Sequence, residues 1–237
     1  MSNGIYAATA GAVAQSNALD ATANNIANAS TTGFHGDRVT FREALSAARA
    51  PDLYNVAAGT TRVDSQIGAM LQTANPLDLA LDGDGYFAVT TPAGPRYTRA
   101  GNFQLDAQRN LVTADGFAVR GDGGAKLSVP PEATLVAVAS DGTVSADGEA
   151  IGKLELPQFA PGQMKREGGS LFSATGPPLT GDPPKVRSGM LESSNVNIIR
   201  GVVDLVKVTR TYESLMKMIQ GYHDLESRAA RELGAPK

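Results

Sequence analysis

The longest periodic pattern of the chain lies in residues 196–232. Large apolar residues recur there at alternating steps of three and four, a spacing that keeps one stripe of an α-helix against a partner helix. Val202, Val206 and Met216 widen this stripe, which favours more than one partner helix. The sequence therefore predicts a long helix that packs against other helices. The stripe consists of Leu205, Val208, Tyr212, Leu215, Ile219 and Tyr222.

A second helical pattern, residues 4–28, lies near the other end of the chain. Its apolar residues are spaced seven apart, and the rest of the stripe is small, so a partner can approach closely while each turn buries little. Such a helix needs docking to be stable. The two terminal helices can pair within one subunit, but the longer one leaves turns that favour contacts with other subunits. The N-terminal stripe consists of Ile5, Ala12, Leu19 and Ile26.

Polar residues indicate where the two helices end. Residues 24–34 are rich in Asn, Ser and Thr, which compete for backbone hydrogen bonds and belong at helix ends and turns. Gly33 can take the positive φ of a tight exit, and Phe34 gives the turn something to bury. At the second helix, the N-cap is expected from Ser193, Ser194 or Asn195.

The middle of the chain, from Asn75 to about Lys185, consists of short β-type runs separated by glycine turns. The Asp-Gly pairs at 82–83, 115–116, 141–142 and 147–148 are typical of hairpins, and no helical period intervenes. An antiparallel all-β domain follows, and two Pro pairs, 177–178 and 183–184, mark its exit. The runs are Tyr86–Val89, Asn102–Leu105, Phe117–Val119, Lys126–Val129, Leu135–Val138 and Lys153–Leu156.

These patterns predict an α+β fold in which long N- and C-terminal helices pair as a coiled-coil-like helical domain, with an inserted all-β, Gly-rich middle domain. The expected divisions are residues 1–34 for the N-terminal helix, 35–74 for a connector, 75–185 for the β domain and 186–237 for the C-terminal helix. In the connector, residues 38–49 look weakly helical and residues 51–68 look like a loop.

Composition and charge exclude several classes of protein. With 237 residues and 42% hydrophobic content, the chain can bury a core. A net charge of −3 argues against nucleic-acid binding. No apolar run approaches the roughly 18 residues of a membrane span. The absence of cysteine excludes disulfides and thiolate metal sites. Ala12-Val13-Ala14 resembles a signal-peptidase site, but no Lys or Arg precedes Arg38, so no cleaved signal is expected.

Three short stretches or residue pairs of the sequence suggest a chemical site. Gly83–Ala88 fits a loose dinucleotide-binding pattern, but a strand pattern follows it where a helix is needed. Asp82–Gly85 suggests calcium, but Ala93 stands where a calcium loop needs Glu, so a hairpin turn is expected. His35 and His223 lack a third ligand or a serine partner and are expected at the surface. We therefore expect no catalytic site, metal or cofactor.

Three blocks of sequence resemble the flagellar rod and hook family of axial proteins, in the family's order. They are Asn24–Phe34, then Asn75–Phe87 with Tyr97–Phe103, and then Gly189–Asn197 followed by Arg210–Glu213. The resemblance implies a structural subunit of the flagellar basal-body rod rather than an enzyme. It also implies that the terminal helices build an inner tube, the drive shaft that transmits torque, with the β domain facing outward.

Within the family, the opening Gly4–Gly11, the compact length and the ending Tyr212–Ile219 resemble subunits of the proximal rod. The alternative is a distal-rod subunit of the same family, which shares most of these blocks. Ala29-Ser30 and His35-Gly36 depart from the usual family residues. Two further alternatives fit less well: a surface fibre subunit does not explain three ordered blocks, and a hydrolase needs a polar cluster that the sequence lacks.

The resemblance also implies partners and a location. The partners are other rod subunits, proximal and distal, copies of the chain itself, and the flagellar type III export apparatus, with no nucleic acid and no membrane span. The location is the rod within the periplasm, reached without a cleaved signal peptide. The expected assembly-interface residues are Ile5, Ala12, Leu19, Asn24, Asn25, Ile26, Asn28, Gly33, Phe34, Asn195, Val196, Leu205, Val208, Tyr212, Leu215, Ile219 and Tyr222.

Overall fold

The computed structural model describes residues 2–40, 43–44, 55–56, 60–160 and 162–234. The chain forms two compact units, each built from segments that are far apart in the sequence. The helical unit consists of Met1–Ala27, Asp37–Arg62 and Asn197–Lys237, and the β unit consists of Asn28–Gly36 and Val63–Val196.

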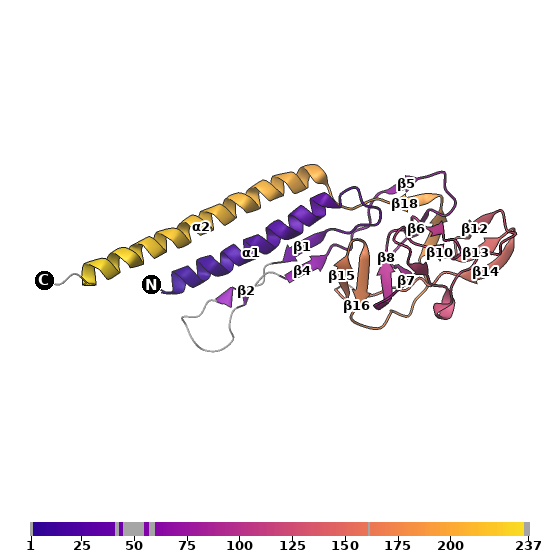
Figure 1. The fold of residues 1–237 in the computed structure, drawn as a ribbon, viewed down its shortest axis with the longest axis horizontal. Helices are drawn as coiled ribbons and strands as arrows, with labels where there is room; N and C mark the ends of the chain where they lie inside the picture. Colours follow the sequence, from indigo (N-terminus) through magenta and orange to yellow (C-terminus); the bar gives the residue numbers. More distant parts are fainter. Residues whose placement is uncertain (1, 41–42, 45–54, 57–59, 161, 235–237) are drawn as a thin grey trace. The chain divides into compact units, whose positions relative to one another are not determined.

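Two helices dominate the helical unit, α1 (Ser2–Ala27) and α2 (Ile198–Gly234). They lie side by side and run in opposite directions, as Figure 1 shows. Gly4 lies beside Tyr222 at one end of the pair, and Gly201 lies beside Ile26 at the other. The predicted pairing of the two terminal helices is confirmed, and the prediction that α2 is the longer of the two is confirmed as well.

Short strands complete the helical unit. β1 (Asp37–Thr40) pairs with β4 (Thr60–Val63), and β2 (Glu43–Ala44) pairs antiparallel with β3 (Asn55–Val56). Both β1 and β3 contact α1. The expectation of weak helix in residues 38–49 is therefore wrong where the structure describes them. The expectation of loop in residues 51–68 is wrong for residues 55–56 and 60–63, and it is confirmed for residues 64–68, which form neither helix nor strand. The β-branched residues of β1 and β4 suit a strand better than a helix. Residues 41–42, 45–54 and 57–59 of these predictions lie outside the described residues.

The β unit is built from antiparallel strands, as predicted. In the described part of the chain they form a seven-stranded sheet in the order β15-β16-β8-β7-β11-β10-β9, a three-stranded sheet β12-β13-β14, and two ribbons, β6-β17 and β5-β18. The strands are β5 (Met70–Gln72), β6 (Leu79–Asp82), β7 (Phe87–Thr91), β8 (Gly94–Thr98), β9 (Gln104–Leu105), β10 (Leu111–Val112), β11 (Ala118–Val119), β12 (Val136–Val138), β13 (Thr143–Ala146), β14 (Glu149–Lys153), β15 (Met164–Gly168), β16 (Leu171–Ala174), β17 (Lys185–Ser188) and β18 (Met190–Glu192).

Three of the four Asp-Gly pairs form the predicted hairpins, which join β10 to β11, β12 to β13 and β13 to β14. In the last of these, Asp147 and Gly148 both have positive φ, 50° and 92°, as a mirror-image two-residue turn requires. The hairpin predicted at Asp82-Gly83 is wrong, because β6 before it pairs with β17 and not with the following strand β7. A local turn signal does not reveal a partner strand that lies far along the chain.

Two predicted runs differ from the observed strands. Residues 126–129 form isolated bridges to Arg120 and Asn110 rather than a strand, and the strand expected at 153–156 ends at Lys153. The two Pro pairs do not mark the exit of the chain from the β unit, because β17 follows them and pairs with β6. Apolar side chains from the seven- and three-stranded sheets and from β6 and β17 form one core, in which Phe87 and Phe103 meet edge to face with ring centres 5.0 Å apart.

Candidate assembly interface

The predicted apolar stripe of α2 is half-buried against the rest of the helical unit. Small residues of α1 face it: Gly11 lies beside Leu215, and Gly4 lies beside Tyr222 one heptad further along. Ala8 and Ala12 are buried in α1. The two helices therefore approach closely without large side chains from α1, as the sequence predicts. Half-buried residues of the predicted stripes are Ile5, Leu19, Ile26, Leu205, Val208, Tyr212, Leu215, Ile219 and Tyr222.

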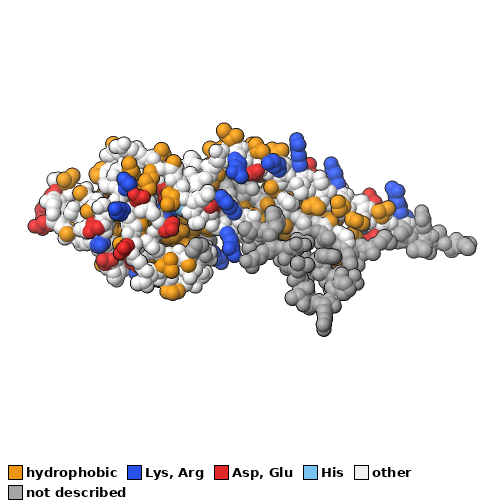
Figure 2. Space-filling view, turned by 180° about the vertical axis from the view of Figure 1, so that it is seen from behind, with side chains coloured by type: hydrophobic (Ala, Val, Ile, Leu, Met, Phe, Trp, Pro, Cys, Tyr) orange, Lys and Arg blue, Asp and Glu red, His pale blue; other side chains and the backbone are white. Residues whose placement is uncertain are grey.

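A second apolar surface lies at the start of α2, where aliphatic side chains are largely exposed. We call it the α2 patch, and Ile199 at its centre is 79% exposed. Figure 2 shows apolar side chains on the surface of the helical unit, with Lys and Arg side chains projecting among them. Val202 and Val206 were predicted to widen the stripe, whereas Ile198, Ile199 and Val203 were not predicted to take part in an interface. Residues four apart, such as Ile199 and Val203, lie on one face of a helix, so the sequence does contain this signal. The α2 patch consists of Ile198, Ile199, Val202, Val203 and Val206.

Two large apolar side chains of α1 are also exposed. Tyr6 is 73% exposed and Val13, seven residues later, is half exposed. Asp20 is the only charged residue in the whole of α1. A helix that presents aromatic and aliphatic side chains to water, with almost no charge around them, is suited to burial by another protein.

The polar residues at the end of α1 make contacts within the subunit. The side chain of Asn25 donates to the Asp37 carbonyl at 2.8 Å and accepts from the Asp37 amide at 2.7 Å, so it fixes the start of β1. Asn28 accepts a hydrogen bond from the Thr31 hydroxyl at 3.2 Å. Asn24 is exposed. The part that these three residues play in assembly stays a prediction.

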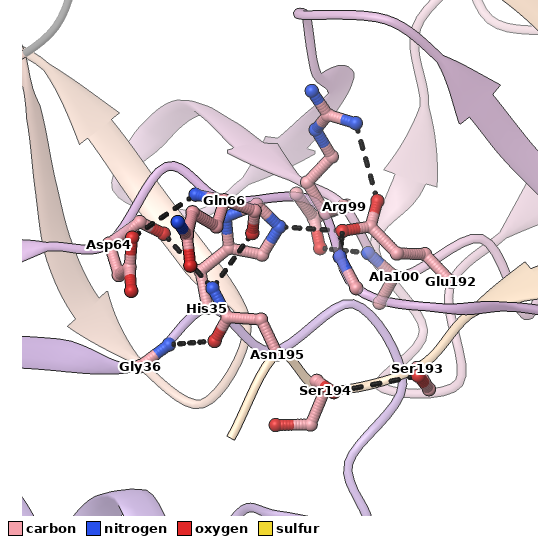
Figure 3. Close-up of polar contacts among 12 residues, drawn as sticks. His35, Gly36, Asp64, Gln66, Arg99, Ala100, Glu192, Ser193, Ser194 and Asn195 are labelled. Atoms are coloured by element: carbon pink, nitrogen blue, oxygen red, sulfur yellow. Dashed lines mark hydrogen bonds and ion pairs between the residues drawn. The ribbon is translucent and has the colours of Figure 1, made fainter. Parts of the chain in front are cut away.

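The β unit contains a junction where three chain segments meet. The first junction segment, residues 28–36, follows α1. The second, residues 63–72, begins at the last residue of β4. The third, residues 189–196, ends just before α2. Figure 3 shows their polar contacts. The chain leaving α1 and the chain entering α2 run beside each other, because Gly33 N donates to Glu192 O at 2.8 Å and Asn195 N donates to Phe34 O at 3.2 Å.

Asn195 joins all three junction segments with its side chain. Its Oδ1 accepts from Gly36 N at 2.7 Å, and its Nδ2 donates to the carbonyls of Gln66 at 2.8 Å and Asp64 at 3.3 Å. Asn195 is therefore not the N-cap of α2. The helix begins at Ile198, and the side chain of the preceding residue, Asn197, accepts from Arg200 N at 3.0 Å. The predicted cap position was two residues too early at best. Val196 is half-buried.

Glu192 lies at the centre of the junction and is fully buried. Its Oε1 lies 2.7 Å from His35 Nε2 and accepts from Gly68 N at 3.0 Å, while its Oε2 accepts from Arg99 Nη1 at 3.2 Å. A second nitrogen of Arg99 donates to the Gly83 carbonyl at 2.8 Å. Because a carboxylate only accepts hydrogen bonds, Nε2 of the imidazole is the donor in this contact.

The surroundings of Glu192 favour its charged form. Burial by itself raises the pKa of this carboxyl, but the hydrogen bond from His35 and the charge of Arg99 outweigh it, and the pKa of Glu192 is lowered from its ordinary value. The expectation that His35 lies at the surface is wrong: only 1% of it is exposed. Its partner is 157 residues away in the sequence, so no local pattern announces the pair.

Gly33 and Phe34 are buried inside the β unit. Gly33 has a φ of 64°, and a side chain there would collide with the backbone of Arg99 and Ala100. The guanidinium of Arg166 lies 4.3 Å from the Phe34 ring centre, and it also donates to the His35 carbonyl. The structure thus gives Gly33 and Phe34 an intramolecular role, and their predicted contact with other subunits is not tested.

The described residues form neither a metal-binding cluster nor a membrane-spanning helix. Among the described residues, no three His, Asp or Glu side chains are grouped as a metal site would require. Over the same residues, neither long helix is apolar enough to cross a membrane. Paired terminal helices with exposed apolar side chains, in a chain that also forms a hairpin-rich β unit, define the class of structural proteins that are built to assemble.

Comparisons with known proteins identify the family. Three family models match in order: "Flagella basal body rod protein" at residues 5–35, "Flagellar hook protein FlgE/F/G D1 domain" at residues 80–146, and "Flagellar basal body rod FlgEFG protein C-terminal" at residues 187–232. The flagellar basal-body rod protein FlgF of Rhizobium meliloti is 32% identical over 100% of both chains, and that of Escherichia coli is 35% identical over 97% of both. FlgG of Bacillus subtilis is 35% identical over 85% of this chain and 88% of its own.

The chain therefore belongs to the FlgE/F/G family of flagellar basal-body rod and hook proteins. It is a structural, non-enzymatic subunit of the basal-body rod, similar to the proximal-rod protein FlgF over its whole length.

Proposed function

We propose that the chain assembles with copies of itself and with proximal and distal rod subunits through the surfaces that its two helices leave exposed. The observation that carries this proposal is the α2 patch, five aliphatic side chains at the start of α2 that are about half exposed or more. Tyr6 and Val13 form the corresponding surface on α1. Membership of a rod family supports a subunit of the same kind as the occupant of both surfaces.

The energetics are sufficient for a repeating interface. Completing the burial of one half-exposed Val or Ile contributes about 1 kcal/mol, since full burial is worth about 1.5–3 kcal/mol. The five residues of the α2 patch together would contribute several times that amount, and every subunit repeats the contact. The half-buried stripe residues remain partly accessible and can add to the interface.

The helical domain, residues 1–34 and 186–237, would then form the inner tube that transmits torque, with the β domain, residues 75–185, facing outward and residues 35–74 between them. The exposed apolar surfaces of α1 and α2 support an inner position for the helices. Among the described residues of the β unit, the exposed large apolar side chains lie on strands and loops and form no continuous helix face; they are Ile67, Leu71, Leu135 and Leu179.

Export by the flagellar type III apparatus without cleavage is part of the same proposal, with the periplasmic part of the rod as the destination. Ala12 and Ala14 of the apparent signal-peptidase site are buried in α1. Cleavage after Ala14 would remove the half of α1 that carries Gly4 and Gly11, which face α2. Mass spectrometry of the assembled protein should find the N-terminus at Met1 or Ser2. A mature chain that begins at Gln15 would contradict this part of the proposal.

A charge placed in the α2 patch tests the assembly proposal. Val202→Asp puts a carboxylate where a neighbouring helix is expected, and burying an unpaired charge costs several kcal/mol. Because Val202 is 46% exposed, the variant subunit should fold normally. We expect rod assembly and motility to be lost while the melting transition of the β unit is unchanged.

The matched control is Leu135→Asp on the exposed surface of the β unit, where Leu135 is 62% exposed. This change adds the same charge at a position outside the proposed interface and should leave motility intact. A motile strain that carries Val202→Asp would remove the α2 patch from the interface.

A further inference from the structure

The three junction segments form a closed triangle of backbone hydrogen bonds. Each pair of segments is joined by its own backbone hydrogen bond, and the third segment does not contribute an atom to that bond. The first and second segments are joined by Asp64 N donating to Gly36 O at 2.7 Å, the second and third by Ser193 N donating to Ala69 O at 2.8 Å, and the first and third by Gly33 N donating to Glu192 O at 2.8 Å.

The Glu192 carboxylate lies among the three junction segments and makes hydrogen bonds that link them. It belongs to the third segment, it is bonded to His35 from the first and to Gly68 N from the second, and Arg99 reaches it from the end of β8. A buried carboxylate that loses one of its partners keeps the full cost of its desolvation. Undocking of either of the other segments therefore leaves the third segment with a poorly paired buried charge.

The three junction segments pack closely against one another. A side chain at Gly68 would collide with the Ser193 carbonyl, so the second and third segments are in backbone contact. Asn195 fills the space between the first and second segments, where it accepts from Gly36 N and donates to Gln66 O. Each segment is thus in direct contact with both of the others.

We propose that Glu192 is a latch that makes the docking of the three junction segments one cooperative step. The chain that leaves α1 is held on the β unit only while the chain that enters α2 is held there, and the reverse is also true. The segments that follow α1 and precede α2 are consequently docked or released together. This property goes beyond the assembly role and is independent of it, since every contact involved lies within one subunit.

Amide hydrogen exchange on the full chain, resolved by residue, tests the latch with the variant His35→Leu. This change removes one hydrogen bond from the first segment and keeps both Gly68 and Arg99 on Glu192. We expect the amide of Ser193 to exchange about ten- to a hundredfold faster, the factor that corresponds to one hydrogen bond with a charged partner. The Ser193 bond involves only the second and third segments, so its acceleration reports coupling.

The Arg120 amide, which donates to Ala88 O at 2.8 Å inside the β unit, should exchange at its original rate. Independent docking of the segments predicts a different result, in which the amides of Gly33 and Asp64 exchange faster and that of Ser193 does not. That result would overturn the latch. His35→Gln, whose amide keeps a donor, should restore most of the protection of Ser193.

A second variant approaches the triangle from another side and covers the case in which His35→Leu fails to fold. Gly68→Ala pushes the second segment away from the third, and the reporter is then the amide of Gly33, which joins the first and third. Faster exchange at Gly33 supports the latch, and an unchanged rate there refutes it. The control is Asp82→Asn, which removes an exposed ion pair with Arg187 in the same unit and should leave all three junction amides unchanged.

Discussion

Glycine-to-alanine changes in the two long helices measure how closely α1 and α2 approach. In a helix interior, Ala is more favourable than Gly by about 1 kcal/mol, provided that the added methyl group has space. Gly221 in α2 has no neighbouring atom within 4 Å of an added Cβ, so Gly221→Ala should stabilise the helical unit by that amount. At Gly11 the nearest atom, Cδ1 of Leu215, would lie at 3.4 Å, an ordinary contact, so Gly11→Ala should also stabilise.

Gly201 is the informative position, because an added Cβ would lie 2.9 Å from Cγ1 of Ile26 in α1. Overpacking of this kind costs about 1–3 kcal/mol, which cancels or exceeds the gain in helix propensity. We therefore expect Gly201→Ala to be neutral or destabilising by up to about 2 kcal/mol. The measurement is a urea titration of the full chain, with helix loss followed by far-ultraviolet circular dichroism.

A double-mutant cycle then assigns the effect to the helix contact. Ile26→Ala removes the atoms that Gly201→Ala would meet, so in that background the same change should stabilise the helical unit by about 1 kcal/mol, as Gly221→Ala does in the original chain. If Gly201→Ala stabilises the original chain as much as Gly221→Ala, the ends of α1 and α2 are not packed as the structure shows. The antiparallel register would then be refuted at this end.

Three further predictions concern the junction and the stripe. The pKa of Glu192 is lowered from the ordinary value of 4.5, so its carboxylate stabilises the folded β unit above that pH, and this stabilisation is lost as the pH falls through the lowered pKa. Glu192→Gln should therefore weaken the dependence of the melting temperature on acid pH, which melting curves recorded over a pH series would show. Gly33→Ala should destabilise the β unit by about 3 kcal/mol or more in a urea titration, since the new side chain would meet a positive φ and collide with the backbone of Arg99 and Ala100. The control, Gly181→Ala at an exposed position, should destabilise the β unit far less. Leu215→Asp should abolish the helical transition and motility while the β unit keeps its own transition, because it places a charge in the half-buried stripe; a motile strain with this change would refute the assigned role of the stripe.

Much of the fold was predictable because its signals are local. The steps of three and four from Leu205 to Tyr222 identify α2 and the face it buries, since the period of a helix repeats within a few residues. Asp147-Gly148 identifies a hairpin because both residues must adopt positive φ. In these cases the sequence within one turn of a helix, or within one turn between strands, contains the physical cause of the structure.

The junction was not predictable, because its causes lie far apart in the sequence. The Asp82-Gly83 pair has the composition of a hairpin turn, yet β17, about a hundred residues later, supplies the partner of β6. His35 resembles a surface histidine until Glu192 is placed beside it. The resemblance to the rod family directed attention to Gly33, Phe34 and Asn195 but assigned them to contacts between subunits. The structure shows that these three residues connect segments of a single subunit.

That difference changes how the matched blocks near the two ends of the chain are understood. The first family model ends at His35, and another begins at Arg187, so each match includes a junction segment as well as a helix. The choice of residue at a junction position is limited by hydrogen-bond partners in the other junction segments of the same subunit. The choice of residue in the α2 patch is limited only by the neighbouring subunit that covers it in the proposed assembly. Substitutions at Glu192 should therefore alter the exchange of amides in the isolated subunit. Substitutions at Ile199 should leave that exchange unchanged and act only when subunits meet, so the two classes of residue are separable by experiment on one chain.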